Sequence, residues 1–289
     1  MKEPKLAICI AFLLIIVVLG GGCIEENHQV QSNIIYVDDS GTSNYKNIQD
    51  AINASHENYT IFVYSGIYHE NIFINKTVNL IGEDATTTII DGNGMGDVIY
   101  IFEDGKANIS GFTIKESGYN DAGIIIHSNN NTITGNNISD NNYGIYSSNS
   151  KYNNFSQNTI LLNSNYGIYL DSNSDNNVIS DNVFSDNTCG LRIKGSKNNE
   201  VFRNLFTDNL KGMYFCCGAR YNTVFLNVFS NNSIWNGDDQ VDSNNWDNEI
   251  AGNYWDDYNG LDEDGDGIGD TPYIVSSKGQ DNYPLMDKR

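Results

Sequence analysis

The sequence is poor in basic residues: 16 Lys and Arg stand against 37 Asp and Glu in 289 residues, a formal net charge of −21. Nucleic acid needs a basic surface, so this deficit excludes DNA and RNA as partners. Proline is rare, with three residues, yet 39% of residues are hydrophobic and only 18% are charged, which argues against a disordered chain. The chain is instead rich in Asn, Ser and Gly. Because Asn and Gly tolerate left-handed backbone, this composition favours many short strands joined by tight turns.

Long hydrophobic runs are also missing, with one exception near the N-terminus. The apolar run Leu6–Leu19 follows two lysines and leads into small residues that end at Cys23. Its 14 residues are fewer than the roughly 20 of a membrane span, but they suit the core of a signal peptide. The segment resembles a lipoprotein signal, in which Cys23 becomes the lipidated first residue and anchors the protein to a membrane. Plain secretion and an uncleaved anchor are the alternatives.

Cysteine is scarce as well. Beyond the N-terminal segment only Cys189, Cys216 and Cys217 remain, an odd number that cannot form a complete disulfide scaffold. Copper sites use thiolate, thioether and imidazole ligands, and these side chains are few and scattered here. We therefore expect the three cysteines to act as small buried hydrophobic residues, and we expect no copper site.

Internal repetition is the strongest feature that the sequence does have. One Asn recurs at intervals of 22 to 26 residues, at Asn136, Asn158, Asn182, Asn204, Asn227 and Asn253. A Gly recurs at intervals of 21 to 23 residues, at Gly123, Gly144, Gly167, Gly190 and Gly212. This period is too short for propeller blades, and the chain lacks the consensus of leucine-rich repeats. It predicts an all-β fold, a single-stranded right-handed parallel β-helix in which each strand pairs with the same strand of the next coil.

The repeat also predicts which side chains point inward. One inner column comprises Ile133, Phe155, Ile179, Val201, Val224 and Ile250. A second comprises Ile138, Ile160, Phe184, Phe206, Phe229 and Trp255. The recurring Asn then lies at the bend between the two walls and bonds to the Asn of the next coil. Upstream, Ile48, Ala51 and Ile52 share one helical face, which predicts a short helix that caps the N-terminal end.

These features divide the chain into four parts. We expect a signal peptide at 1–23, a tether at 24–33, a β-helix of roughly ten coils at 34–258 and a C-terminal cap at 259–289.

Two stretches carry a resemblance to known proteins. The opening Tyr36-Val-Asp-Asp-Ser-Gly and Ile61-Phe-Val-Tyr-Ser-Gly resemble the start of pectin-lyase-like β-helix proteins. The Asn-rich coils and the ending Gly252-Asn-Tyr-Trp-Asp-Asp-Tyr resemble the NosD-type branch, which includes periplasmic accessory proteins for copper-enzyme maturation and archaeal surface proteins. The resemblance covers residues 34–286 and implies the fold. It implies no particular activity, because one fold hosts many functions.

A candidate binding site follows from the Gly repeat. Each recurring Gly is followed by an apolar residue that should point inward, so the next residue should point outward. Coil stacking would then align Tyr146, Tyr169, Arg192 and Tyr214 as an exposed column. Aromatic rings bind sugar rings and Arg binds a uronate carboxylate, which makes this column a candidate carbohydrate site. The alternative is that Tyr is present only because it suits a strand.

The C-terminal segment contains a calcium-like loop. Its carboxylates and one backbone carbonyl follow the spacing of EF-hand positions 1, 3, 5, 7 and 9, at Asp262, Asp264, Asp266, Ile268 and Asp270. Tyr273 stands where an EF-hand has its bidentate Glu, so the loop looks closer to thrombospondin type 3 or dockerin-like repeats. The pattern predicts bound calcium; a solvated acidic turn is the alternative.

Three functions stay open. The first is an exported, lipid-anchored protein at the cell surface or in the periplasm that binds carbohydrate or cell-envelope partners and has no catalytic residues. The second is a polysaccharide-active enzyme, a lyase or hydrolase. Arg192-Ile-Lys194 resembles a polygalacturonase triplet, although the accompanying Asn-Thr-Asp and Gly-His-Gly motifs are absent. The third is a NosD-type accessory protein for copper-enzyme maturation.

Overall fold

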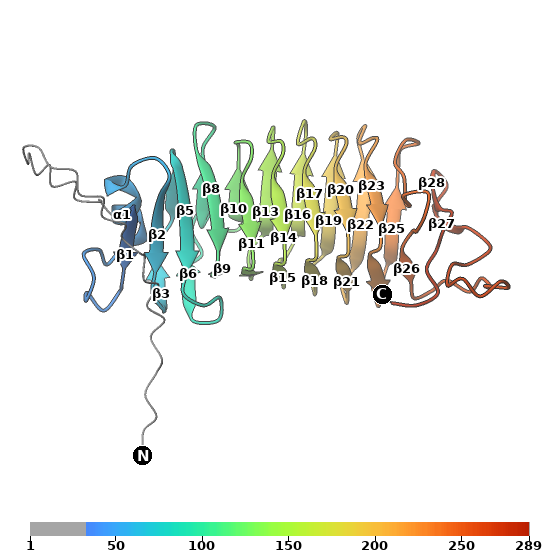
Figure 1. The fold of residues 1–289 in the computed structure, drawn as a ribbon, viewed down its shortest axis with the longest axis horizontal. Helices are drawn as coiled ribbons and strands as arrows, with labels where there is room; N and C mark the ends of the chain where they lie inside the picture. The colour runs from blue at the N-terminus through green and yellow to red at the C-terminus, as the bar shows by residue number, and fades with distance from the viewer. Residues whose placement is uncertain (1–32, 289) are drawn as a thin grey trace, which may run out of the picture. The chain divides into compact units, whose positions relative to one another are not determined.

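The computed structural model describes residues 33–288. The predicted signal peptide and lipidation at Cys23 lie outside the described residues. Residues 33–288 form a parallel β-solenoid of about ten turns with a single short helix (Figure 1). The predicted parallel β-helix is therefore confirmed.

The turns between the first and the last each contribute one strand to each of three parallel sheets, which we call sheets A, B and C. Sheet A comprises β1 (Ile34–Val37), β2 (Tyr59–Val63), β5 (Thr77–Gly82), β8 (Lys106–Ser110), β11 (Thr132–Thr134), β14 (Asn154–Ser156), β17 (Val178–Ser180), β20 (Glu200–Phe202) and β23 (Thr223–Phe225). Sheet B comprises β3 (Gly66–His69), β6 (Thr88–Asp91), β9 (Thr113–Lys115), β12 (Asn137–Ser139), β15 (Thr159–Leu161), β18 (Val183–Ser185), β21 (Leu205–Thr207), β24 (Val228–Ser230) and β26 (Tyr254–Trp255). Sheet C comprises β4 (Ile72–Ile74), β7 (Ile99–Ile101), β10 (Ala122–Ile126), β13 (Tyr143–Ser148), β16 (Tyr166–Asp171), β19 (Cys189–Lys194), β22 (Lys211–Cys216) and β25 (Trp235–Asp239).

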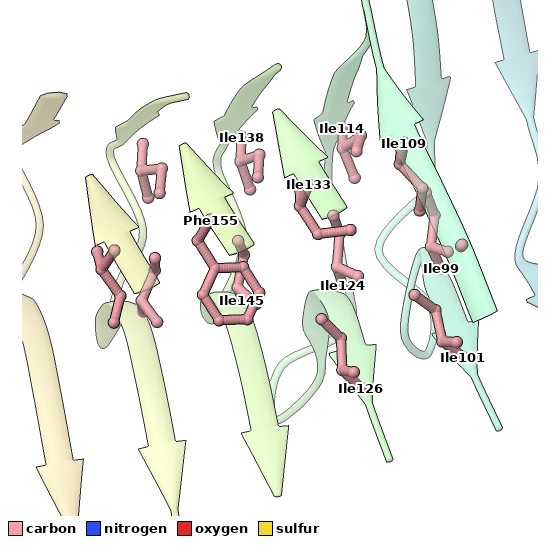
Figure 2. Close-up of a cluster of buried hydrophobic side chains, with 14 of the residues drawn as sticks. Ile99, Ile101, Ile109, Ile114, Ile124, Ile126, Ile133, Ile138, Ile145 and Phe155 are labelled. Atoms are coloured by element: carbon pink, nitrogen blue, oxygen red, sulfur yellow. The ribbon is translucent and has the colours of Figure 1, made fainter. Parts of the chain in front are cut away.

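The core consists of inner columns of apolar side chains, part of which Figure 2 shows. Ile133 pairs with Ile109 on one side and Phe155 on the other, and all three are fully buried. The first predicted column is wrong at its last member, because Ile250 is 75% exposed. Asn245 pairs with Thr223 in that turn, so the buried Trp246 follows Val224 instead. The second column matches the prediction and ends on Trp255.

Three ladders of buried Asn hold the corners between the sheets. The ladder between sheets A and B is the predicted one. A second, between sheets C and A, comprises Asn131, Asn153, Asn177, Asn199, Asn222 and Asn244. A third, between sheets B and C, comprises Asn141, Asn163, Asn187, Asn209 and Asn232. In each rung the side-chain N–H of one Asn donates to the side-chain oxygen of the next, so every ladder's donors point toward the C-terminal end.

Each ladder ends on a carboxylate. Asn244 donates to Asp239, and Asn253 donates to Asp281. The third ladder ends through Asn236, whose amide donates to Asp256 and Asp257. Because the last amide of a ladder has no further Asn to bind, a carboxylate supplies the acceptor that it needs.

Both ends of the stack are covered. At the N-terminal end, the predicted helix is present as α1 (Ile48–Ala54), with Ile48, Ala51 and Ile52 buried. The Glu70 carboxylate accepts the first backbone N–H groups of α1. At the C-terminal end, Tyr273 of β27 (Tyr273–Ser276) stacks on Trp255, and β27 pairs with β28 (Gly279–Asp281).

Candidate functional site

The outer face of sheet C carries one unbroken column of side chains, which we call the outer column. Strand pairing aligns eight residues from eight strands: Phe73, Tyr100, Ile125, Tyr146, Tyr169, Arg192, Tyr214 and Asp238. The four residues predicted from sequence are therefore in register as expected. Close packing against the repeated Gly helps to set this register, because a Cβ on Gly167 would lie 2.6 Å from the carbonyl oxygen of Gly190.

The C-terminal half of the outer column is packed closed rather than exposed. Tyr169 is only 7% exposed. The Arg192 guanidinium lies 4.8 Å from the ring centre of Tyr169 and 5.2 Å from that of Tyr214. Arg192 also donates to the Tyr166 hydroxyl at 2.8 Å. The expected exposure of this part of the column is therefore wrong, because cation–π and hydrogen-bond contacts occupy the Arg192 head group.

Neighbouring charges complete this closed half. The Tyr146 hydroxyl donates to Asp171 at 2.9 Å, and Lys194 pairs with the same carboxylate at 3.1 Å. Burial, followed by the bond to Asp171, raises the pKa of Tyr146 to about 12. Lys194 of the Arg-Ile-Lys triplet is thus engaged by Asp171, and Arg192 by tyrosines. These contacts give the triplet a structural role in this face.

The N-terminal half of the same face is open. Phe73 is 48% exposed, and Phe102, just beyond β7, is 40% exposed. A pocket of about 530 Å³ lies against Phe73, and one of about 320 Å³ is lined by Tyr100, Phe102 and His127. Both pockets belong to strands in which the sequence repeat is weak. Sequence reasoning missed them because no recurring Gly marks β4 and β7.

A third pocket, of about 250 Å³, lies where β7, β10 and β13 meet. Its lining includes Tyr143 and Tyr146 together with two carboxyl groups, those of Asp97 and Asp121. Asp97 accepts the backbone N–H of Ala122 at 2.7 Å. Burial, opposed by that hydrogen bond and reinforced by the charge of Asp121, raises the pKa of Asp97. A carboxyl group in such a setting holds its proton at higher pH than a solvated Asp does.

The predicted calcium loop lies in the C-terminal cap. Carboxylate oxygens of Asp262, Asp264 and Asp266 lie within 4.8 Å of one another, close enough to share one ion. Asp262 accepts the backbone N–H groups of Gly265, Asp266 and Gly267, and these bonds lower its pKa. Asp270 instead accepts the backbone N–H of Glu263 at 2.7 Å. Ile268 pairs with Leu285, which ties the loop to the last coil.

The stacking of coils defines the class of protein: a parallel β-helix. Several solved structures are similar in fold to this chain at low sequence identity. One is XylC in complex with xylose, at 14% identity over 60% of this chain and 36% of that chain, with a TM-score of 0.47. Another is Geobacillus virus E2 ORF18, at 17% identity over 69% of this chain and 52% of that chain, with a TM-score of 0.53. A third is an alginate lyase from Paenibacillus sp. str. FPU-7, at 15% identity over 72% of this chain and 84% of that chain, with a TM-score of 0.49. The chain thus spans about a third of the XylC chain and about half of the viral one. These likenesses concern the fold alone.

The chain itself belongs to the family described as periplasmic copper-binding protein (NosD), whose model matches residues 26–260. No curated protein matches the chain. The periplasmic description of the family agrees with export. Within residues 33–288, no helix combines the length and the apolar character that a bilayer span requires.

Copper, which the family description names, does not fit the side chains of residues 33–288. Cys189 pairs in register with Lys211 and Cys216 with Lys194, so the two lie near opposite ends of their strands. Met213 is buried in the core. Burial raises the pKa of both Cys189 and Cys216, which disfavours the thiolate that a metal needs. Among the described residues, the three loop carboxylates are the only group of three or more His, Cys, Asp or Glu side chains that could share a metal.

Proposed function

We propose that this protein binds polysaccharide chains, without cleaving them, along the outer face of sheet C. The observation that carries the proposal is the outer column, to which eight successive turns contribute one side chain each. Five of the eight are aromatic: Phe73, Tyr100, Tyr146, Tyr169 and Tyr214. Neighbouring strands are about 4.8 Å apart, so the eight positions extend over roughly 34 Å. Such a row supports binding of an extended polymer along the solenoid axis, because aromatic faces pack against the apolar faces of sugar rings.

The open N-terminal half is the better candidate for the contact surface. Phe73, Tyr100 and Phe102 lie with their ring centres 4.4 to 6.4 Å apart and border two pockets. In the other half, Arg192 and the tyrosines around it already contact one another. We therefore propose that β4, β7 and β10 make the first contacts with the polymer, and that the closed half keeps the sheet rigid.

Binding titrations with the full-length protein test this proposal. A glycan array first selects a ligand, and calorimetry then compares Phe73→Ala and Tyr100→Ala with the parent. Each variant should bind about tenfold more weakly, the usual loss for an aromatic side chain at the centre of a contact. Phe202→Ala is the matched control, because Phe202 lies on sheet A and stacks on Phe225. Equal weakening in all three variants would contradict the placement of the site.

A second function, cleavage of the polymer, is favoured by the raised pKa of Asp97. A carboxyl group whose pKa is raised by burial can act as a general acid, and a neighbouring carboxylate such as Asp121 can act as base or nucleophile. Mass spectrometry of oligosaccharides after long incubation distinguishes this function from binding. New reducing ends that disappear in Asp97→Asn would favour an enzyme; intact ligands would favour the binding protein.

We also propose that the protein is exported and anchored through a lipid on Cys23. The apolar run that ends in small residues before this Cys supports the proposal, as does the periplasmic description of the family. Mass spectrometry of protein from native membranes should find residues 1–22 removed and a lipid on Cys23. A mature chain that retains those residues, or has an unmodified Cys23, would contradict it.

Calcium binding at residues 262–270 is a further part of the proposal. The convergence of Asp262, Asp264 and Asp266 supports it, and a divalent cation would offset the repulsion between them. The carbonyl of Ile268 and the carboxylate of Asp270 would complete the ligand set. The bound ion would stabilise the cap that covers the last coil.

A further inference from the structure

The pocket where β7, β10 and β13 meet has an unusual charge. Asp97 and Asp121 both line it, and its remaining lining residues include no Lys or Arg. Within residues 33–288, the Asp121 carboxylate takes part in no hydrogen bond or ion pair. The Asp97 carboxyl accepts one backbone N–H, and the two groups lie close enough for Asp121 to raise the pKa of Asp97.

Four other carboxylates on the solenoid surface each pair with a basic side chain. The pairs, at 2.8 to 3.2 Å, are Asp91 with Lys115, Asp171 with Lys194, Asp175 with Lys151 and Asp181 with Arg203. Within the described part of the chain, neither Asp97 nor Asp121 has such a partner. His127 acts on Asp97 from a distance and is charged only when protonated. The pocket therefore holds negative charge that the protein itself leaves uncompensated, beside the rings of Tyr143 and Tyr146.

We propose that this pocket is a subsite for a sugar unit that carries a protonated amine, so that the polymer bound on sheet C is an amino-sugar polymer. The inference rests on the proposed function, of which it names the ligand class. The amine supplies the missing cation between two carboxylates, as a charge-assisted hydrogen-bond donor. The faces of Tyr143 and Tyr146 add a cation–π contribution. A volume of about 250 Å³ accommodates one sugar unit and the polar contacts it needs.

The same charge disfavours acidic polysaccharides. A uronate carboxylate in this pocket would meet two like charges at short range without a Lys or Arg to offset them, and like-charge contacts suppress binding. The chain's net charge of −21 adds to the repulsion at longer range. The protein therefore discriminates against uronate polymers although its fold is shared with an alginate lyase.

Calorimetry with three tetrasaccharides at one ionic strength tests the inference. The probes are glucosamine tetramer, its N-acetylated counterpart and tetragalacturonate, each titrated into the full-length protein. The parent should bind the free-amine tetramer at least about tenfold more tightly than the acetylated one, and should not bind the uronate. The double variant Asp97→Asn/Asp121→Asn should bind both glucosamine forms equally. Asp140→Asn, at an exposed position one coil further along the same corner between sheets B and C but outside the lining of the pocket, controls for general attraction between an acidic protein and a cation, and it should keep the preference.

The outcomes separate the two proposals. If the acetylated or acidic tetramer binds as tightly as the free-amine tetramer while Phe73→Ala weakens binding, the amino-sugar subsite is wrong and the sheet C site stands. If Asp140→Asn loses as much of the preference as the double variant, the attraction is general and the subsite is again wrong. If no oligosaccharide binds at all, both proposals fail. Loss of the preference in the double variant alone supports the subsite.

Discussion

Removing a single rung from an Asn ladder should be among the most damaging substitutions in this protein. Asn182 is 1% exposed and lies in the middle of the ladder between sheets A and B. Its side-chain oxygen accepts two N–H bonds from Asn158, one from the backbone and one from the amide, at 2.9 and 3.0 Å. Its own amide donates to the Phe155 carbonyl at 2.8 Å and to the Asn204 side chain at 3.0 Å.

The cost of Asn182→Ala follows from which groups lose their partners. The Asn158 amide keeps its bond to the Ile133 carbonyl, and the Asn204 oxygen keeps the Asn182 backbone N–H. The Asn158 backbone N–H and the Phe155 carbonyl each lose a partner at a buried site. An unsatisfied buried polar group costs about 1–3 kcal/mol, so the free energy of unfolding should fall by about 4 kcal/mol. That is a large part of the stability of a typical domain.

Urea denaturation followed by circular dichroism measures this loss. The control is Asn154→Ala, which removes the same side chain from the outer face of β14, where the Asn154 amide makes one bond of 3.3 Å to Ser156. The control should change the free energy of unfolding by less than about 1 kcal/mol. If the two variants lose equal stability, the ladder is not what holds the corner together, and the argument is refuted.

Four further predictions follow from the corners, the cap and the close packing. Leu162 has φ 56° and is 51% exposed. Because Asn tolerates left-handed backbone better than Leu does, Leu162→Asn should raise the free energy of unfolding by about 0.5–1 kcal/mol. The control Leu210→Asn, at an exposed position without positive φ, should give no gain. Millimolar calcium should raise the melting temperature, and Asp264→Ala with Asp266→Ala should abolish that rise; no calcium heat in calorimetry would leave a plain acidic turn. Burial raises the pKa of the Asp281 carboxyl group from 3.8 to about 6. Between these pH values the folded protein binds more protons than the unfolded chain, so the parent becomes more stable as pH falls from 7.5 to 4. Asp281→Asn removes this dependence, so the variant's stability relative to the parent should rise by about 2–3 kcal/mol between pH 4 and pH 7.5; a difference in urea titrations that does not change with pH would contradict this. Gly167→Ala should lower the melting temperature, because its Cβ would meet the Gly190 carbonyl oxygen at 2.6 Å; an unchanged melting temperature would show that the coils can move apart.

The repeat made much of the fold predictable. In the coils between residues 130 and 232, the residue before every ladder Asn has positive φ. The bend at each corner is therefore set by two or three neighbouring residues, and it can be recognised in a short stretch of sequence. Because the same bend recurs once in every coil, the spacing of Asn136 and its equivalents predicts which residues pair between neighbouring strands. The second ladder, from Asn131 to Asn244, and the third, from Asn141 to Asn232, recur at the same spacing and are equally visible in the sequence, but the prediction named only the ladder that contains Asn136. The error at Ile250 arose where the coil lengthens and Asn244 rather than Asn248 continues the ladder.

From the sequence alone, the period of the repeat predicts the β-helix, all but the last member of its inner columns and the alignment of Tyr146, Tyr169, Arg192 and Tyr214, because parallel strands pair at that period. The capping helix is predicted separately, from the apolar face that Ile48, Ala51 and Ile52 share. Which part of the outer face of sheet C is open follows only from the packing between coils. Whether an outward side chain is exposed depends on its neighbours in adjacent coils: Arg192 closes over Tyr169, whereas Phe73 has no such cover. The pocket of Asp97 and Asp121 likewise joins residues 24 positions apart that no motif links, since it is the stacking of one coil on the next that brings their carboxyl groups together.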